Sequence, residues 1–325
     1  MTRKLGLIGA VAAAVALAVT GCAGGAGGKV SADSSGLLPV KIGYTAPGAG
    51  YSDLYVAADY GIFKKHGLNV QLVRLNTSSQ LVASLASNSV QIGVGVAQDS
   101  AAAILKGAPL KFVAMSEPHY NLEMWASPSI KTIQDLRGKK VAISAPGSES
   151  DFGLTALLNS KGMQRGDVQT EFVQGIPAEV AALDSGSVQA ILTQPPNGTQ
   201  SKEKGAIRLA SLSNLDFPLG SYTVESKYLQ NNRDVVTKFV QADAEALRYL
   251  RANPTNTEKS IQKYTGVSSP SLAQYAYTFF INVWAQTPAV REDLIAQAFK
   301  DAAATAHVSA PSNVSQYIDN MAGSS

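Results

Sequence analysis

The stretch from Val40 to Val73 constrains the fold of this chain more than any other part. It begins with alternating apolar side chains, as in a half-buried strand, and a loop with one proline and two glycines follows. A helical apolar stripe then runs over residues 54–62 until Gly67 ends the helix, and a second strand-like run closes the unit. Because the loop at the carboxyl end of a parallel strand faces a crevice, we expect residues 46–53 to face a ligand.

The amino terminus has the pattern of an export signal. Two basic residues, Arg3 and Lys4, precede an uncharged apolar run over residues 5–19, which is too short for a stable membrane span. The run ends in Val19-Thr20-Gly21-Cys22, which resembles the lipobox of bacterial lipoproteins and implies that Cys22 becomes a lipidated amino terminus. We expect residues 1–21 to be a lipoprotein signal peptide, and an ordinary signal peptide cleaved elsewhere is the alternative.

Composition limits the class of protein that follows the signal. Cys22 is the only cysteine, so the exported part forms no internal disulfide and depends on its hydrophobic core. Residues 22–36 are mostly glycine, alanine and serine, and we expect a flexible tether there. The 27 basic residues, two of them in the leader, nearly balance the 24 acidic ones, and no basic run occurs. This composition argues against a nucleic-acid-binding protein.

The remaining chain is organised in three parts. Strand-like and helix-like segments alternate first up to residue 122 and again up to residue 224, which predicts a parallel α/β sheet in each part. After Glu225 the periodicity is helical without a clear strand, and such helices need an existing sheet to pack on. We expect a discontinuous first domain of residues 37–122 and 225–325, a second domain of residues 123–224, and crossings between them at Leu122–Ser127 and Ser221–Val224.

Several short motifs occur in an order known from one protein family. They are Ile42-Gly43-Tyr44, residues 57–70 (AADYGIFKKHGLNV), residues 136–141 (LRGKKV), the loop over residues 145–148, and residues 182–190 with Gly186 and Val188. Together they resemble the SsuA-like substrate-binding proteins, which serve ABC importers for sulfonates, nitrate, taurine and thiamine precursors, although Gln189 stands where that group usually has Asp. The resemblance covers about residues 38–310. It implies a type II periplasmic-binding-protein fold, in which two α/β domains close on a ligand through two hinge crossings.

Such a fold presents helix starts to its ligand, and four of the loops fit this description. Free backbone N–H groups at a helix start favour an acceptor by roughly 0.3–1 kcal/mol, but Ser, Thr and Asp there are equally ordinary helix caps. The candidate ligand contacts in these loops are Tyr51, Ser52, Asp53, Thr77, Ser78, Gln98, Asp99, Ser148 and Glu149. Ligand contact and capping both stay open for each of them.

Four further candidates lie outside the helix starts. His119 and Tyr120 would join Tyr51 in an aromatic wall, for which packing of a loop is the alternative. Gln194 and Asn197 follow a strand of the second domain and would offer amide groups across the cleft, unless they only form a turn.

The charge of these loops bears on the ligand. They carry acids and no Arg or Lys, the acids being Asp53, Asp99, Glu117, Glu149 and Asp151. A site without basic groups argues against a bare anion such as nitrate. It favours a neutral, zwitterionic or amine-bearing molecule, including a heteroaromatic one.

The leading interpretation is an extracytoplasmic, lipid-anchored monomer that delivers a small molecule to an ABC permease in the membrane. We expect no enzyme activity, cofactor or metal, because the three histidines lack metal-ligand spacing and no dinucleotide, phosphate-loop or nucleophile motif occurs. One alternative is an exported sensor or interaction protein on the same fold. The other is an enzyme of the thiamine-pyrimidine-synthesis type, which relies on a cysteine-rich motif that this chain lacks.

Overall fold

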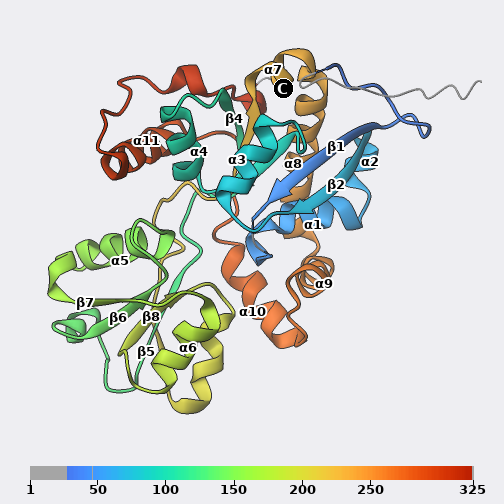
Figure 1. The fold of residues 1–325 in the computed structure, drawn as a ribbon. Coiled ribbons are helices and arrows are strands. Elements are labelled where there is room, and N and C mark those ends of the chain that lie inside the picture. Colours follow the sequence, from blue (N-terminus) through green and yellow to red (C-terminus); the bar gives the residue numbers. More distant parts are fainter. Residues whose placement is uncertain (1–27, 46, 324–325) are drawn as a thin grey trace, which may run out of the picture.

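The computed structural model describes residues 28–45 and 47–323, which form two α/β domains (Figure 1). The predicted signal peptide, Cys22 and the first part of the predicted tether lie outside the described residues. Each domain is built on one five-stranded sheet with helices packed on it. In the described ranges, no helix combines the length and apolar character needed to cross a membrane.

The first sheet has the strand order β2-β1-β3-β10-β4. Its members are β1 (Leu38–Tyr44), β2 (Leu68–Arg74), β3 (Ile92–Gly95), β4 (Leu110–Met115) and β10 (Ser221–Glu225). β1 pairs in parallel with both β2 and β3, which confirms the predicted strand, helix and strand unit. β10 runs antiparallel between β3 and β4.

The second sheet repeats this plan in the order β7-β6-β8-β5-β9. Its members are β5 (Glu123–Ala126), β6 (Lys140–Ile143), β7 (Gln169–Phe172), β8 (Ala190–Thr193) and β9 (Ile207–Ser211). β6 pairs in parallel with β7 and β8, whereas β5 runs antiparallel between β8 and β9.

One antiparallel strand in each sheet departs from the predicted parallel pairing. β5 is the first strand that the chain forms in the second domain, and β10 is the first strand that it forms after it returns to the first domain. The two short strands interpreted as crossings between the domains are therefore inner strands of the sheets, and β10 belongs to the first sheet rather than to the second domain. The connections between the domains are residues 116–122 and 212–220.

Most helices belong to the first domain. They are α1 (Ser52–Asp59), α2 (Ile62–Lys65), α3 (Ser78–Ala86), α4 (Ala97–Leu105), α7 (Ser226–Asn231), α8 (Arg233–Ala252), α9 (Pro254–Thr265), α10 (Pro270–Phe280) and α11 (Glu292–Ala306). The second domain contains α5 (Glu149–Ser160) and α6 (Ile176–Asp184). The single helix expected over residues 54–62 is two helices, because Gly61 adopts a left-handed backbone with φ of 73° between them.

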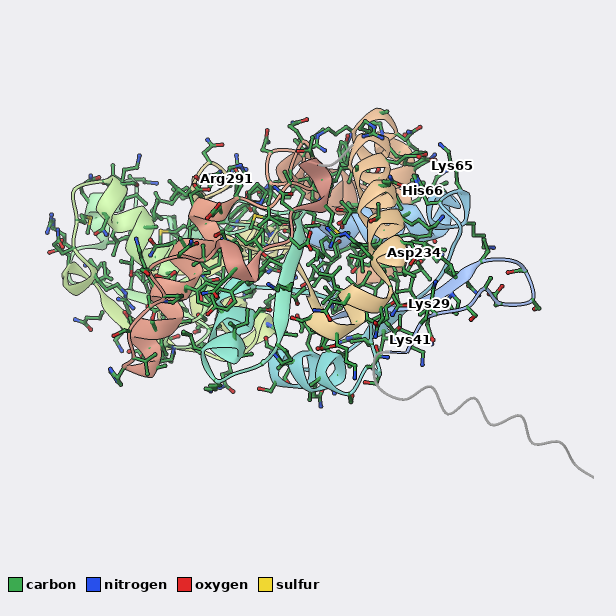
Figure 2. The ribbon with its side chains drawn as sticks, turned by 90° about the horizontal axis from the view of Figure 1, so that it is seen from above. Lys29, Lys41, Lys65, His66, Asp234 and Arg291 are labelled. Carbon is green, nitrogen blue, oxygen red and sulfur yellow. The ribbon has the colours of Figure 1, made fainter. Side chains whose placement is uncertain are left out.

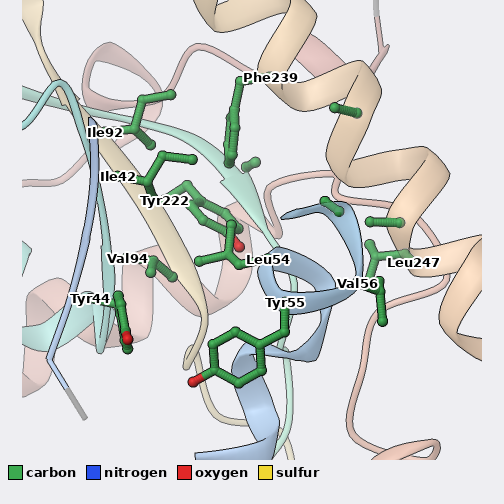
Figure 3. Close-up of a cluster of buried hydrophobic side chains, with 14 of the residues drawn as sticks. Ile42, Tyr44, Leu54, Tyr55, Val56, Ile92, Val94, Tyr222, Phe239 and Leu247 are labelled. Carbon is green, nitrogen blue, oxygen red and sulfur yellow. The ribbon is translucent and has the colours of Figure 1, made fainter. Parts of the chain in front are cut away.

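The core of the first domain lies between its sheet and the helices α1 and α8. Ile42, Leu54, Tyr222 and Phe239 are fully buried there (Figure 3). Burial of each such side chain contributes roughly 1.5–3 kcal/mol. α8 and α9 both pack against α1, so the carboxyl-terminal helices cover the first sheet as the sequence predicts.

Polar contacts supplement this packing at the surface. Lys65 and His66, at the end of α2, lie beside α8 (Figure 2) and reach Glu245 of that helix at 2.8 and 2.9 Å. Helix α2 is thus fixed to α8 by these polar contacts as well as by packing.

Candidate functional site

A pocket of about 120 Å³, called here the junction pocket, lies where the two domains and both connections meet. The first domain contributes Thr45, Gly48, Gly50, Tyr51, Gly95 and Val96, from the loop after β1 and the end of β3. The connections contribute Glu117, Asn121, Leu219 and Gly220, and the second domain contributes Glu149 and Gln194. Because the lining comes from both domains, hinge motion would open and close this pocket.

Glu117 is the most buried acid of the pocket, with 2% of its surface exposed. Its Oε2 accepts a hydrogen bond from Asn121 Nδ2 at 3.3 Å. Gly50 lies so close to this carboxyl that a Cβ atom there would come within 2.4 Å of its Oε1, so a larger residue at position 50 would require the Glu117 side chain to shift. Burial, followed by the charge of Asp53, raises the pKa of Glu117 to about 8. A positive group beside the carboxyl would lower that pKa and release the proton.

Asn121 connects the two acids of the pocket. Its side chain donates to Glu117, and its backbone N–H donates to Glu149 Oε1 at 3.3 Å. Burial raises the pKa of Glu149, the first residue of α5, to about 7. Asn121 Oδ1 is buried and has no hydrogen-bond partner among the described residues. The pocket therefore offers two carboxyls and an amide oxygen as acceptors, an arrangement that suits a ligand rich in N–H donors.

Tyr51 and Gln194 face the same space from opposite domains. The Tyr51 ring packs edge-on to Tyr44, with centroids 5.6 Å apart, and forms part of the wall. Across the pocket, a Cβ atom placed on Gly48 would lie 3.6 Å from Gln194 Oε1, so the second domain reaches the glycine loop of the first. Within the described part of the chain, no group of three or more His, Cys, Asp or Glu residues is placed to hold a metal ion.

Ser52 and Asp53, predicted to contact ligand, lie in the core behind the pocket. Both are fully buried, and Ser52 Oγ donates to Ala49 O at 2.6 Å. Asp53 Oδ2 accepts from the Tyr222 hydroxyl, and its carboxyl lies beside that of Asp243 on α8. The helical turn of α1 points the Asp53 side chain toward β10 and α8, away from the glycine loop. The geometry thus assigns both residues to the core.

The predicted residues at the starts of α3 and α4 also lie away from the junction pocket. Thr77 Oγ1 caps α3 by accepting from the backbone N–H of Gln80 at 3.1 Å. Ser78 Oγ donates to Asp99 Oδ2 at 2.5 Å, and both line a separate surface pocket between α3 and α4. Gln98 Nε2 donates at 3.2 Å to an aspartate of α11. These contacts agree with the capping and packing alternatives.

His119 and Tyr120 join structural contacts near the hinge. His119 Nδ1 lies 3.0 Å from Asp216 Oδ1, which links the two connections. Asp216 also pairs with Arg291, just before α11, at 2.8 Å. Tyr120 is 4% exposed and stacks on Phe217 with ring centroids 4.3 Å apart. Neither predicted residue lines the junction pocket, because both side chains pack on the second connection instead, His119 at Asp216 and Tyr120 at Phe217.

Ser148 and Asn197 hold the backbone next to pocket residues. Ser148 Oγ caps α5 by accepting from the backbone N–H of Asp151 at 3.3 Å. Asn197 Nδ2 donates to the backbone oxygen of Gln194 at 2.8 Å and closes the turn after β8. Of the sequence-predicted residues, Tyr51, Glu149 and Gln194 line the junction pocket.

The pocket residues that are absent from the predicted ligand contacts include Glu117, Asn121, Leu219 and Gly220. They belong to the connections between the domains, from which the prediction selected the neighbouring His119 and Tyr120 instead. The available signal was the segment after β4, in which an acid and an amide directly follow an apolar strand.

Solved structures share this architecture. The periplasmic aliphatic sulphonate binding protein SsuA from Escherichia coli is 20% identical, superimposes with a TM-score of 0.70, and is matched over 83% of this chain and 92% of that one. The alkanesulfonate-binding protein SsuA from Xanthomonas axonopodis pv. citri, bound to MOPS, is 19% identical with a TM-score of 0.65 over 87% and 98% of the two chains. These likenesses confirm the predicted type II periplasmic-binding-protein fold.

Relatives are also found by sequence. A binding protein of Brucella abortus is 26% identical over 243 residues, which cover 72% of this chain and 74% of that protein. The riboflavin-binding protein RibY of Chloroflexus aurantiacus is 25% identical over 64% of this chain and 61% of its own. The sequence profile of the family described as NMT1/THI5 like matches residues 50–257, which is more than half of the chain. The chain therefore belongs to the NMT1/THI5 like family and has the SsuA-like fold of substrate-binding proteins.

Proposed function

We propose that this protein is an extracytoplasmic, lipid-anchored solute-binding protein of an ABC importer, and that it captures a small organic molecule between its two domains. The family and the fold support a substrate-binding role. The observation that carries the proposal is the junction pocket, whose lining comes from both domains and both connections. A ligand there makes its full set of contacts only when the domains are together, so it stabilises the closed form.

The lining of the pocket also restricts the ligand. Its described residues include two glutamates and the unpaired Asn121 Oδ1, and none of them is Lys, Arg or His. A bare anion would sit beside two carboxyls without a positive partner, which is unfavourable in a buried site. We therefore propose a neutral, zwitterionic or heteroaromatic molecule that carries N–H groups. The name of RibY supports this choice, since riboflavin is neutral and heteroaromatic.

The size of the pocket agrees with a protein that opens to load. About 120 Å³ is less than the roughly 300–1,000 Å³ of most small-molecule sites. The domains must separate about the connections to admit an organic molecule, and closure then removes it from water. Such opening and closing is the hinge motion that serves capture and release.

Thermal unfolding of the purified protein, with both domains present, in a panel of compounds tests the ligand class. The panel contains alkylamines, amino-substituted heteroaromatics, zwitterions, alkanesulfonates and nitrate. We expect stabilisation by members of the first three classes, by roughly 2.7 kcal/mol for a ligand at 100 times its Kd. Tight binding of nitrate or an alkanesulfonate, with no response to the first three classes, would overturn the proposed ligand.

The lipid anchor has a separate test. Wild type and a Cys22→Ala variant, expressed with the leader, are compared for membrane association and for incorporation of a labelled fatty acid. We expect the wild type in the membrane fraction with label, and the variant without label. Equal labelling of both proteins would contradict acylation at Cys22.

A further inference from the structure

A second chamber of about 240 Å³ adjoins the junction pocket inside the second domain. It lies between the starts of α5 and α6 and the end of β8, and we call it the α6 chamber. Its polar lining residues are Ser144, Glu149, Ser150, Glu179, Thr193 and Gln194. Two of these, Glu149 and Gln194, also line the junction pocket, so the two spaces share a common wall at the domain boundary.

The α6 chamber contains a buried acid of its own. Glu179 lies in the first turn of α6 and is 3% exposed. Burial raises the pKa of its carboxyl to about 7, with the Thr193 hydroxyl nearby as a smaller, opposing influence. Thr193 Oγ1 is itself buried and lacks a partner of hydrogen-bonding geometry among the described residues. The Thr193 hydroxyl can supply one donor to this carboxyl, which leaves most of the acceptor capacity of the pair open to a further donor.

Each of the two spaces has a buried acid that the other lacks. Glu117 and an unpaired amide oxygen belong to the junction pocket, and Glu179 and an unpaired hydroxyl belong to the α6 chamber. Between them stands Glu149, while Leu122, Ile176 and Leu192 give the α6 chamber an apolar wall. The described lining of the chamber contains no basic side chain. This pattern is complementary to a carbon chain or ring with a nitrogen group at each end.

We propose that the α6 chamber is a second subsite of the same cleft, and that the ligand is an elongated molecule with a cationic or N–H-bearing nitrogen group at each end, one beside Glu117 and the other beside Glu179. This inference rests on the proposed solute-binding function and deepens it. The nitrogen group at each end supplies the donors that the buried acceptors lack, and the apolar wall packs against the carbon part.

Linear α,ω-diamines with four to eight carbons test the proposal, each paired with the monoamine of equal length. Calorimetry at pH 8.5 gives the Kd of every compound for the wild type and for Glu117→Gln, Glu179→Gln and Glu171→Gln variants. Glu171 is a matched control, since it lies in the same domain on β7 with its side chain 44% exposed. Thermal unfolding without amine shows that each variant is folded.

We expect the best diamine to bind the wild type at least tenfold more tightly than its monoamine. Glu179→Gln should remove that difference while the monoamine keeps its Kd, because only the second nitrogen reaches this carboxyl. Glu117→Gln should weaken both compounds, and Glu171→Gln should change neither. If diamine and monoamine bind the wild type equally, or if Glu179→Gln affects both alike or neither, the second subsite is overturned and the proposed function stands. If no amine binds and an alkanesulfonate does, the second subsite and the proposed ligand class both fail, and the solute-binding role stands.

Discussion

Glu117 and Glu123 lie a few residues apart in the chain and are both buried, yet their surroundings differ. Glu123 accepts hydrogen bonds from Tyr275 Oη at 2.8 and 2.9 Å, from Arg208 Nη1 at 2.9 Å and from Trp125 Nε1 at 3.1 Å. Among the described residues, the Glu117 carboxyl accepts one hydrogen bond, from an amide at 3.3 Å. Both side chains are nearly inaccessible, with exposures of 0% and 2%.

The difference separates a structural acid from one available to a ligand. A carboxylate has about four acceptor positions, and Glu123 fills them with a charged guanidinium, a phenol and an indole. Since Tyr275 belongs to α10 and Glu123 to β5, this cluster also ties the two domains together. Glu117 keeps most of its acceptor capacity inside the junction pocket, where a ligand supplies the missing donors.

The largest expected effect follows from removal of the structural acid. Glu123→Ala leaves the donors of Arg208, Trp125 and Tyr275 without their common acceptor, and we expect a loss of about 3–5 kcal/mol in the free energy of unfolding. Equilibrium urea denaturation measures it, with Glu171→Ala as the exposed control. A loss below 1 kcal/mol would show that the cluster does not hold the domains together.

Substitution of Glu117, the acid of the junction pocket, should reduce ligand affinity and leave the stability nearly unchanged. In Glu117→Gln the side chain keeps its shape and loses the charge, so we expect affinity for a cationic amine to fall by about 1.5–3 kcal/mol. The free energy of unfolding without ligand should change by less than about 1 kcal/mol or increase, because the buried acid is gone. Calorimetry and urea denaturation measure the two quantities, and Glu203→Gln serves as an exposed control. A destabilisation as large as that of Glu123→Ala would remove the distinction between the two acids.

The fold was predictable to a greater extent than the site. The alternation around Val40–Val73 is a local pattern, and the structure confirms it as β1, α1, α2 and β2. The sequence predicts β5 and β10 as short strands that cross between the domains, but their antiparallel partners, which place them inside the sheets, are distant in the chain. Strand membership of this kind depends on long-range pairing rather than on local periodicity.

The site depended on side-chain direction, which the sequence pattern does not determine. Tyr51 and Asp53 are two residues apart, and the helical turn directs one to the pocket and the other to Tyr222 in the core. Glu117 and Asn121 reach the pocket because the connection folds back against Gly50, a contact visible only in three dimensions. The sequence shows that these loops are rich in acids, whereas the structure shows which of the acids line the junction pocket.

The pH dependence of stability and affinity offers a third test of the difference between Glu117 and Glu123. Glu117 binds its proton up to a pKa of about 8 in the folded protein, against an ordinary value of 4.5 that applies when unfolded. Between these pH values the folded state holds more protons, so the free energy of unfolding should fall as pH rises from 5 to 8.5. The affinity for a permanently charged amine should rise over the same range. Urea denaturation and calorimetry across this pH range should show both trends reduced in Glu117→Gln, and equal trends in that variant would assign them to other groups.

The smallest expected effect comes from a substitution that weakens the contact between the domains and leaves the charge of Glu123 in place. Tyr275→Phe removes one hydroxyl from Glu123 and leaves Arg208 and Trp125 in place, so we expect a loss of about 1 kcal/mol in the free energy of unfolding. Because this hydroxyl joins α10 to β5, its loss should also favour separation of the domains, and small-angle X-ray scattering without ligand should give a larger radius of gyration than for wild type. Tyr60→Phe, whose hydroxyl bonds within the first domain, should leave the radius unchanged. If Tyr275→Phe loses stability at a constant radius, the Glu123 cluster supports the fold and has no part in opening the cleft.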